Sequence, residues 1–414
     1  MSMLRKPITL AVLASGMCSL GVVPAVHAED EFINALTSGK VSFSARARYE
    51  GVEQDNALKD ADAFTLRTTL GYKTGAFHGF SGMIEFEDVS ELGADDYNSL
   101  TNGQTAYSVV ADPDGTEVNQ AYLAYSGFDS EFRLGRQEIT YRQAPFHRFV
   151  GNVLWRQNHQ SFDAFSISNN ALPDTQISYA YINKINTIFG DDRNAGIIKD
   201  GVIDMDSHLF NIQYSGLPIG KLEGYGYFLD YDDAPATSSR TVGLRLNGAQ
   251  AVNETVKVIY TAEFANQGDY KDGTMDDQNY YLAELGAKYR NWLAKVSYEV
   301  QEGDGTDSFN TPLGTNHAFQ GWADQFLTTP SQGLVDLFFT VAGNVMGAKL
   351  VAVYHDFETD EDSLDAGSEL DLLAEKTFAE HYTLGVKYAD YKGDSEFPGK
   401  VDTEKFWLYG QVKF

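Results

Sequence analysis

The sequence contains almost no cysteine. Cys18 is the only one among 414 residues, and it lies in an N-terminal segment that we expect to be removed. A chain without thiols can form no disulfide bond, no cysteine-ligated zinc site and no cysteine nucleophile. We also expect no lipid anchor on Cys18, because the residue before it is Met17 rather than a small residue.

Basic charge and long apolar runs are scarce as well. The chain has 31 Lys and Arg against 59 Asp and Glu, a net charge of -28 that disfavours nucleic acid as a partner. After residue 28 no apolar stretch approaches the ~20 residues that a membrane helix needs, although aromatic residues reach 13%. The sequence therefore leaves two classes, a soluble all-β protein or a transmembrane β-barrel.

The first 28 residues predict an export signal. Arg5 and Lys6 form a basic start, residues 8–23 are apolar apart from small polar residues, and 26–28 offer small residues before a cleavage site. The apolar run is too short for a membrane-spanning helix. We expect cleavage between Ala28 and Glu29, leaving 29–414 as one domain.

Polarity alternates with period two along many segments. In residues 41–50 the odd positions are apolar or aromatic and the even positions are polar or charged, and 63–73 and 255–266 behave alike. This period is that of a strand with one face on lipid or a core and the other on water. We expect 18 such strands, at residues 41–50, 63–73, 80–88, 117–125, 131–140, 162–169, 175–184, 207–215, 221–231, 239–247, 255–266, 279–289, 292–301, 333–343, 348–358, 368–376, 382–391 and 403–414.

The connections between these strands alternate in length. Short ones such as 74–79 and 290–291 alternate with long ones such as 141–161 and 302–332. Tight periplasmic turns and long outer loops are typical of bacterial membrane barrels, and this pattern places both termini in the periplasm.

The C-terminal strand supports the same interpretation. Its apolar face ends in the terminal aromatic residue Phe414, which resembles the signal recognised by the barrel-assembly machinery. A soluble β-propeller is the alternative, but no glycine-histidine or tryptophan-aspartate repeat recurs. We predict a closed antiparallel barrel of about 18 strands in the bacterial outer membrane, in contact with lipid and lipopolysaccharide.

A barrel of this size has a lumen too wide for wall side chains to fill, so we expect it to conduct solutes. Eight of the 12 arginines after residue 28 lie between Arg46 and Arg156. A row of guanidinium groups can bind carboxylates repeatedly, although each arginine could instead pair with a neighbouring acid. The candidate pore-lining residues are Arg46, Arg48, Arg67, Arg133, Arg136, Arg148, Arg156, Arg245 and Lys257.

Two predicted loops are unusually aromatic for segments in water. Residues 141–161 include Trp155, and Phe319, Trp322 and Phe326 follow one another at helical spacing within 317–327. We expect both loops to fold into the barrel mouth and constrict it, the second with a short helix against the wall.

No catalytic motif or metal-ligand spacing accompanies these features. The loop and rim histidines His147, His159, His317, His355 and His381 lie in no nucleophile motif, so we expect no catalytic residue and no cofactor. The acidic loops, such as 230–233 and 356–365, lack the spacing of a calcium loop, and solvation explains them better than divalent-cation binding.

Four segments resemble the alginate export family of outer-membrane porins. They are Ala111–Leu123 (ADPDGTEVNQAYL), Leu134–Gln137 (LGRQ), Arg148–Asn158 (RFVGNVLWRQN) and His317–Pro330 (HAFQGWADQFLTTP). The resemblance extends over nearly the whole mature chain and implies an 18-strand barrel with an arginine-lined channel for an anionic polyuronate such as alginate. By position it implies lumen contacts for Arg67, Arg136, Arg148 and Arg156.

The leading interpretation is a passive, anion-preferring channel for alginate-like polyuronates, in export or by diffusion. A porin for uptake of small carboxylates is the alternative within transport. A surface adhesin using the long outer loops and a hydrolase at the rim are the alternatives from other classes.

Overall fold

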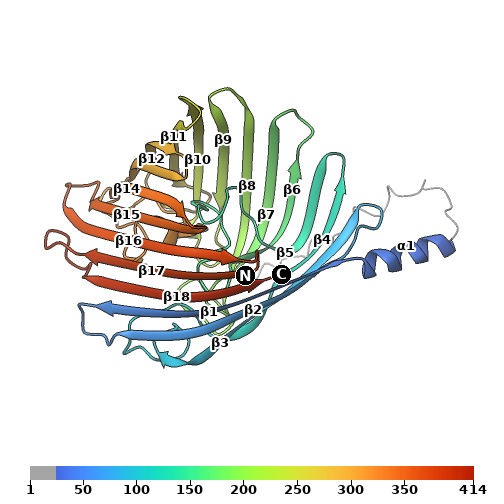
Figure 1. Cartoon of the computed structure of the whole chain (residues 1–414), viewed down its shortest axis with the longest axis horizontal. Helices are drawn as coiled ribbons and strands as arrows, with labels where there is room; N and C mark the ends of the chain where they lie inside the picture. The colour runs from blue at the N-terminus through green and yellow to red at the C-terminus, as the bar shows by residue number, and fades with distance from the viewer. Residues whose placement is uncertain (1–24) are drawn as a thin grey trace, which may run out of the picture.

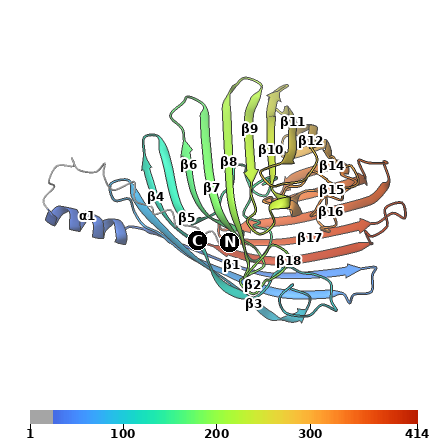
Figure 2. The same ribbon diagram turned by 180° about the vertical axis from the view of Figure 1, so that it is seen from behind.

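Eighteen antiparallel strands form one closed sheet in the computed structural model, which describes residues 25–414. Each strand pairs with its neighbours along the chain, and β1 (Lys40–Gln54) pairs with β18 (Thr403–Lys413), which closes the ring (Figures 1 and 2). The predicted 18-strand barrel is confirmed. The other strands are β2 (Ala61–Lys73), β3 (Phe80–Asp96), β4 (Gly115–Gly127), β5 (Ser130–Gln137), β6 (Ser161–Asn169), β7 (Thr175–Asn186), β8 (Val202–Leu217), β9 (Gly220–Leu229), β10 (Ser239–Ala251), β11 (Val256–Asp269), β12 (Gln278–Tyr289), β13 (Trp292–Gln301), β14 (Leu334–Val345), β15 (Ala348–Glu358), β16 (Asp365–Phe378) and β17 (Tyr382–Lys392).

The two faces of the sheet have opposite polarity. In β1, Arg46, Arg48 and Glu50 are buried on the inner face, whereas Val41 on the outer face is 66% exposed. Large apolar side chains such as Leu244 and Leu408 are about half exposed on the outer face of other strands. An apolar exterior around a polar interior is the reverse of a water-soluble protein and fits a barrel surrounded by lipid.

The connections at the two ends of the barrel differ in length, as predicted. Eight turns join the strands at the end where β1 begins, and four of them, 128–129, 218–219, 290–291 and 346–347, have only two residues. Phe128 and Asp129 both have positive φ, as expected for the type I′ turn that matches the twist of adjoining strands. The opposite end carries nine loops, of which 138–160 and 302–333 are the longest.

Local features of β4 and β9 explain why the alternation of polar and apolar residues is hard to follow in their sequences. A register shift opposite Glu85 and Phe86 leaves Asn119 of β4 unpaired, so the alternation changes phase there. β9 is regular, but its inward residues include Tyr225 and Tyr227, which hides the polar–apolar contrast. The helix expected within 317–327 is wrong, because only a 3-10 turn, η2 (Asn316–Ala318), forms there. A second 3-10 turn, η1, covers Pro235–Thr237.

The helix α1 (Ala25–Thr37) precedes β1 and points away from the barrel in both views (Figures 1 and 2). Its end is fixed at the turn end of the barrel, where the Tyr72 hydroxyl donates to the carbonyl of Leu36 and Phe32 meets Phe77 edge to face. No helix within 25–414 is long and apolar enough to cross a membrane. The predicted cleavage site lies in α1, and residues 1–24 of the predicted signal lie outside the described residues.

Candidate functional site

The β5–β6 loop (138–160) enters the barrel and contacts the wall on both sides. Near its start, Arg142 pairs with Glu223 of β9, Nε to Oε2 at 3.1 Å, and with Glu263 of β11. Although burial opposes the charge, Glu263 and Glu223 raise the pKa of Arg142 well above its usual range. Phe149 packs against Tyr225 and Tyr280, at centroid distances of 4.9 and 5.5 Å.

The β13–β14 loop (302–333) also lies inside and joins the first loop. The Gly151 amide donates to the Leu313 carbonyl and the Thr315 amide to the His147 carbonyl, both at 2.8 Å. The Gln160 side chain donates to the same Leu313 carbonyl at 3.1 Å. The two loops therefore form one partition across the lumen. Their role in constricting the path of a solute stays a prediction.

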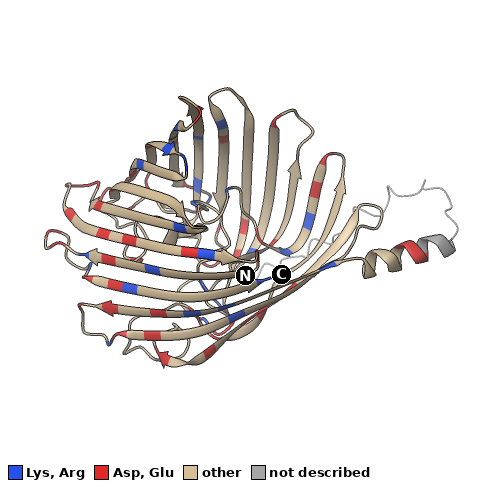
Figure 3. Ribbon diagram, viewed as in Figure 1, with Lys and Arg blue, Asp and Glu red and all other residues tan. Residues whose placement is uncertain are grey.

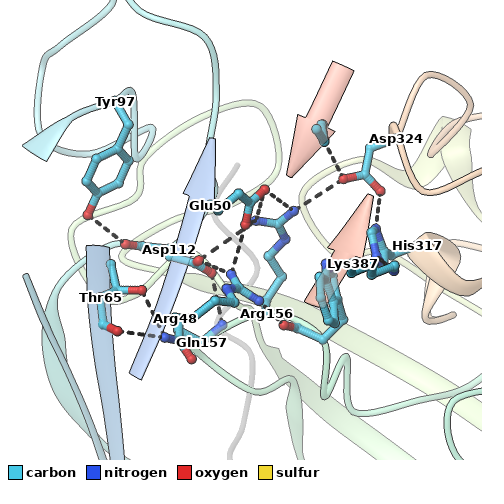
Figure 4. A network of polar contacts seen from close by, with 12 residues as sticks. Arg48, Glu50, Thr65, Tyr97, Asp112, Arg156, Gln157, His317, Asp324 and Lys387 are labelled. Atoms are coloured by element: carbon cyan, nitrogen blue, oxygen red, sulfur yellow. Dashed lines mark hydrogen bonds and ion pairs between the residues drawn. The ribbon is translucent and has the colours of Figure 1, made fainter. Parts of the chain in front are cut away.

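A buried set of charges, the central network, connects this partition to the wall (Figure 4). Its members are Arg48 and Glu50 of β1, Asp112 of the β3–β4 loop (97–114), Arg156 and Asp324. Arg156 lies 3.2 Å from both Glu50 and Asp324, and Arg48 lies 3.1 Å from Glu50 and contacts Asp112. One network thus holds three loops against the first strand.

Opposite charges within the network keep its buried groups ionised, although burial alone would favour their neutral forms. Burial alone would raise the pKa of Asp112, but Arg48 and Arg156 lower it below its usual range. Burial likewise disfavours the charge on Arg156, yet Glu50 and Asp112 raise its pKa. Removing Arg156 would take one of two cationic partners from both Glu50 and Asp324, which would keep Arg48 and Lys405 respectively.

His317, which lies beside Asp324 in Figure 4, makes a second attachment together with Trp155. The rings stack with centroids 4.5 Å apart, and the His317 Nδ1 lies 2.6 Å from Asp324 Oδ1. The other ring nitrogen of His317 faces the Lys387 ammonium, which can only donate, so the ring is neutral and donates from Nδ1. Burial lowers the pKa of His317 well below its usual range, and Lys387 adds to that effect against the opposing carboxylate of Asp324.

Most of the predicted pore-lining arginines support the loops. Arg46 donates to the carbonyls of Leu154 and Trp155, at 2.9 and 3.1 Å, and Arg67 contacts His159. Arg148 lies 3.0 Å from Glu299 and donates to Gln320 at 2.9 Å. On the wall, Arg245 lies 3.5 Å from Glu263. The alternative that arginines satisfy buried acids and carbonyls therefore describes these positions.

Arg133 and Arg136 have different surroundings because they are three residues apart on one strand. Arg133 faces the lumen, where its Nε contacts Glu131 and a third of its side chain is exposed. Arg136 lies on the outer face beside Ala121 and pairs with Asp163 at 2.8 Å. The expectation that Arg136 lines the lumen is wrong, because residues an odd number apart on a regular strand lie on opposite faces.

The four aromatic loop residues pack inside the barrel. Phe326 is buried against Phe357 at a centroid distance of 4.8 Å, and Trp322 packs against the same wall near Lys387. Phe319 lies under the Arg148 guanidinium, 4.6 Å from its ring centre. Phe326, Trp322 and Trp155 therefore attach the partition to the wall, whereas Phe319 contacts Arg148 and Phe146 within the partition.

A set of lysines at the turn end of the lumen, the lysine collar, was not predicted as a group from the sequence. Its members lie on inner-face positions within two residues of a strand end: Lys40, Lys73, Lys221, Lys257, Lys288, Lys349 and Lys413. Only Lys257 was a predicted pore residue. Between residues 25 and 414, no acidic group lies within ion-pair distance of any of the seven. Strand phase combined with distance from the turns would have found them.

The collar contrasts with the opposite end of the barrel. Acidic positions gather toward the loop ends of β1–β3 and β16–β18 (Figure 3). Two pairs of collar lysines, Lys40 with Lys73 and Lys257 with Lys288, are direct cross-strand partners. Like charges directly opposite cost roughly 0.2–1 kcal/mol, so the fold alone does not require this arrangement.

Comparison with known proteins identifies the architecture. Solved structures that resemble this chain include OccAB2 of Acinetobacter baumannii (16% identity, 92% of this chain and 99% of that chain, TM-score 0.71) and OccD3 (OpdP) of Pseudomonas aeruginosa (13%, 92% of both, 0.68). OpdK of Pseudomonas aeruginosa, solved with vanillate, is similar too (12%, 92% and 99%, 0.70). The fold is that of an outer-membrane porin. No family model and no curated protein matches the sequence, so the comparisons support a porin fold and not the alginate export family in particular.

Proposed function

We propose that this protein is a passive outer-membrane channel for small organic anions, carboxylates among them. The lysine collar carries the proposal, because it places seven lysines, none within ion-pair distance of a carboxylate of residues 25–414, around the periplasmic opening of a chain whose net charge is -28. Clustered charge of one sign in a low-dielectric opening raises the local concentration of the opposite ion.

The side-chain chemistry of the collar suits passage better than capture. A lysine ammonium is mobile and strongly hydrated, and it binds an anion as a point charge without the fixed fork of arginine. Conduction needs sites that attract an ion and still release it. Exposed lysines such as Lys257 and Lys288 meet both needs.

Small solutes fit the lumen better than an alginate-like polyuronate. The partition is held by backbone hydrogen bonds between the two loops and by the buried central network. A polymer strand would have to displace these contacts along its whole passage, whereas a small anion needs only a gap beside them. Vanillate, present in the OpdK structure, is itself a small carboxylate.

Reversal potentials in planar bilayers test the proposal. Under a KCl gradient we expect anion preference in the wild type and a loss of several-fold in the chloride-to-potassium permeability ratio when Lys40, Lys73, Lys257 and Lys288 are all changed to Gln. Lys376→Gln is the matched control, because Lys376 lies near the same end of β16 on the outer face. Cation preference in the wild type, or equal effects of the control, would reject the proposal.

A further inference from the structure

A polar groove remains open beside the partition. It has a volume of about 430 Å³ and lies between the inner face of β5–β7 and the first residues of the β5–β6 loop, 138–141. Binding sites for small molecules range from roughly 300 to 1,000 Å³, so the groove suits a solute of about monosaccharide size.

The wall of the groove is made of hydroxyl and amide groups. Ser166 and Ser168 of β6, Gln176 and Ser178 of β7 and Gln137 of β5 face it. The wall at β9–β12 differs, because Tyr225, Tyr227 and Tyr280 there are covered by Phe149. Hydroxyls and amides donate and accept hydrogen bonds, which matches a hydroxylated solute rather than an apolar one.

One cation in the groove has free donors. Glu131 engages the Nε of Arg133, and the guanidinium lies 5.1 Å from the ring centre of Tyr122. Its two terminal nitrogens have no hydrogen-bond partner within residues 25–414. This fork can hold a carboxylate with two parallel hydrogen bonds. Glu138, the other groove carboxylate, is occupied by Asn152 and His159.

We propose that this groove binds polyhydroxylated carboxylates, with the carboxylate on Arg133 and the solute hydroxyls on Ser168, Gln176 and Ser178. The inference rests on the proposed anion channel and assigns its substrate class. Gln176 already donates to Ser168 at 2.9 Å, and both side chains keep further hydrogen-bonding capacity that solute hydroxyls can use. A carboxylate without hydroxyls cannot add these hydrogen bonds, so the groove prefers the hydroxylated solute.

Block of ion current by three probes tests this inference on the purified full-length barrel. Gluconate carries both features, hexanoate only the carboxylate, and sorbitol only the hydroxyls. In the wild type we expect gluconate to block at about tenfold lower concentration than either other probe, as expected when several hydrogen bonds of about 1 kcal/mol each are added.

Two variants separate the contributions of charge and hydroxyls. Arg133→Gln should weaken gluconate block about tenfold, and Ser168→Ala with Ser178→Ala should weaken it several-fold while leaving hexanoate block unchanged. Arg136→Gln is the matched control on the outer face of the same strand. Equal block by gluconate and hexanoate in an anion-selective wild type would overturn the groove and leave the channel proposal intact. Cation selectivity would overturn the channel proposal itself.

Discussion

The two basic regions of the lumen use their charge in opposite ways. In and around the partition, Arg148 and Arg156 of the β5–β6 loop and Arg48 of β1 are almost fully buried, and each lies within 3.2 Å of a carboxylate. In the collar, seven lysines near the turns face water with no acidic partner among the described residues. Cations that are buried and paired hold the loops in place, and cations that are exposed and unpaired remain available to solutes.

The chemistry of the two side chains explains this division. Guanidinium is planar, weakly hydrated and rich in fixed donors, so it can satisfy several carbonyls and carboxylates at once in a buried site. Ammonium is compact and strongly hydrated, so it is retained more easily where water remains. Arg46, with its hydrogen bonds to three loop carbonyls, shows the first behaviour, and Lys257 shows the second.

The largest effect should come from breaking the central network. Arg156→Ala leaves Glu50 and Asp324 buried without their shared partner, which typically costs ~3–5 kcal/mol. We expect a lower unfolding temperature in detergent and a larger single-channel conductance, because both loops lose an attachment. If the variant unfolds and conducts like the wild type, the network does not hold the partition.

The second-largest effect should come from acid, which should lower the stability of the folded protein through His317. His317 has a lowered pKa in the folded protein, so below its usual value of 6.5 the unfolded chain binds a proton that the folded chain does not. Stability is therefore fully present above that value and falls by about 1.4 kcal/mol per pH unit below it, until the folded group also protonates. Unfolding measured from pH 7.5 to 5 should show this slope, and His317→Gln should reduce it. An unchanged slope in that variant would mean that other groups are responsible.

The collar should show little effect on stability. Changing Lys40 and Lys73, or Lys257 and Lys288, to Gln removes like-charge neighbours, so we expect an unchanged or slightly higher stability, by ~0.2–1 kcal/mol. Chemical denaturation in detergent compares these variants with the wild type. A clear loss of stability would show that the lysines have structural partners after all.

Raising the salt concentration should have the smallest effect, and it should act on the collar but not on the partition. Exposed charges are screened over ~10 Å at 0.1 M salt and ~3 Å at 1 M, whereas buried pairs are screened much less. Anion preference should therefore decline as KCl rises toward 1 M. Single-channel conductance divided by the conductivity of the solution should stay constant, because the partition does not open. An anion preference independent of salt would point to buried cations instead of the collar.

The fold was readable from the sequence because lipid and water impose period two on each strand. The alternation in 41–50 predicted β1 correctly, and the alternating loop lengths predicted which end carries the turns. The phase of β5 was ambiguous, so Arg133 and Arg136 were both assigned to the lumen although only Arg133 faces it.

The partners of the loop arginines could not be predicted from the alternation of residues along the strands. Arg156 meets Glu50 and Asp324 across separations of 106 and 168 residues, and no local pattern encodes such contacts. The aromatic spacing in 317–327 predicted a helix, but these rings are positioned by wall residues such as Phe357 and Lys387 rather than by a helical backbone. The collar was predictable in principle, since it needs only strand phase and the positions of the turns.

One measurement tests the division of roles most directly, namely reversal potential and conductance recorded side by side for Arg156→Gln and for the four-lysine collar variant. We predict that Arg156→Gln keeps the anion preference while its conductance increases. The collar variant should lose the preference while its conductance state remains that of the wild type and its stability is unchanged or slightly higher. Loss of anion preference in Arg156→Gln with an unaffected collar variant would contradict this division of roles.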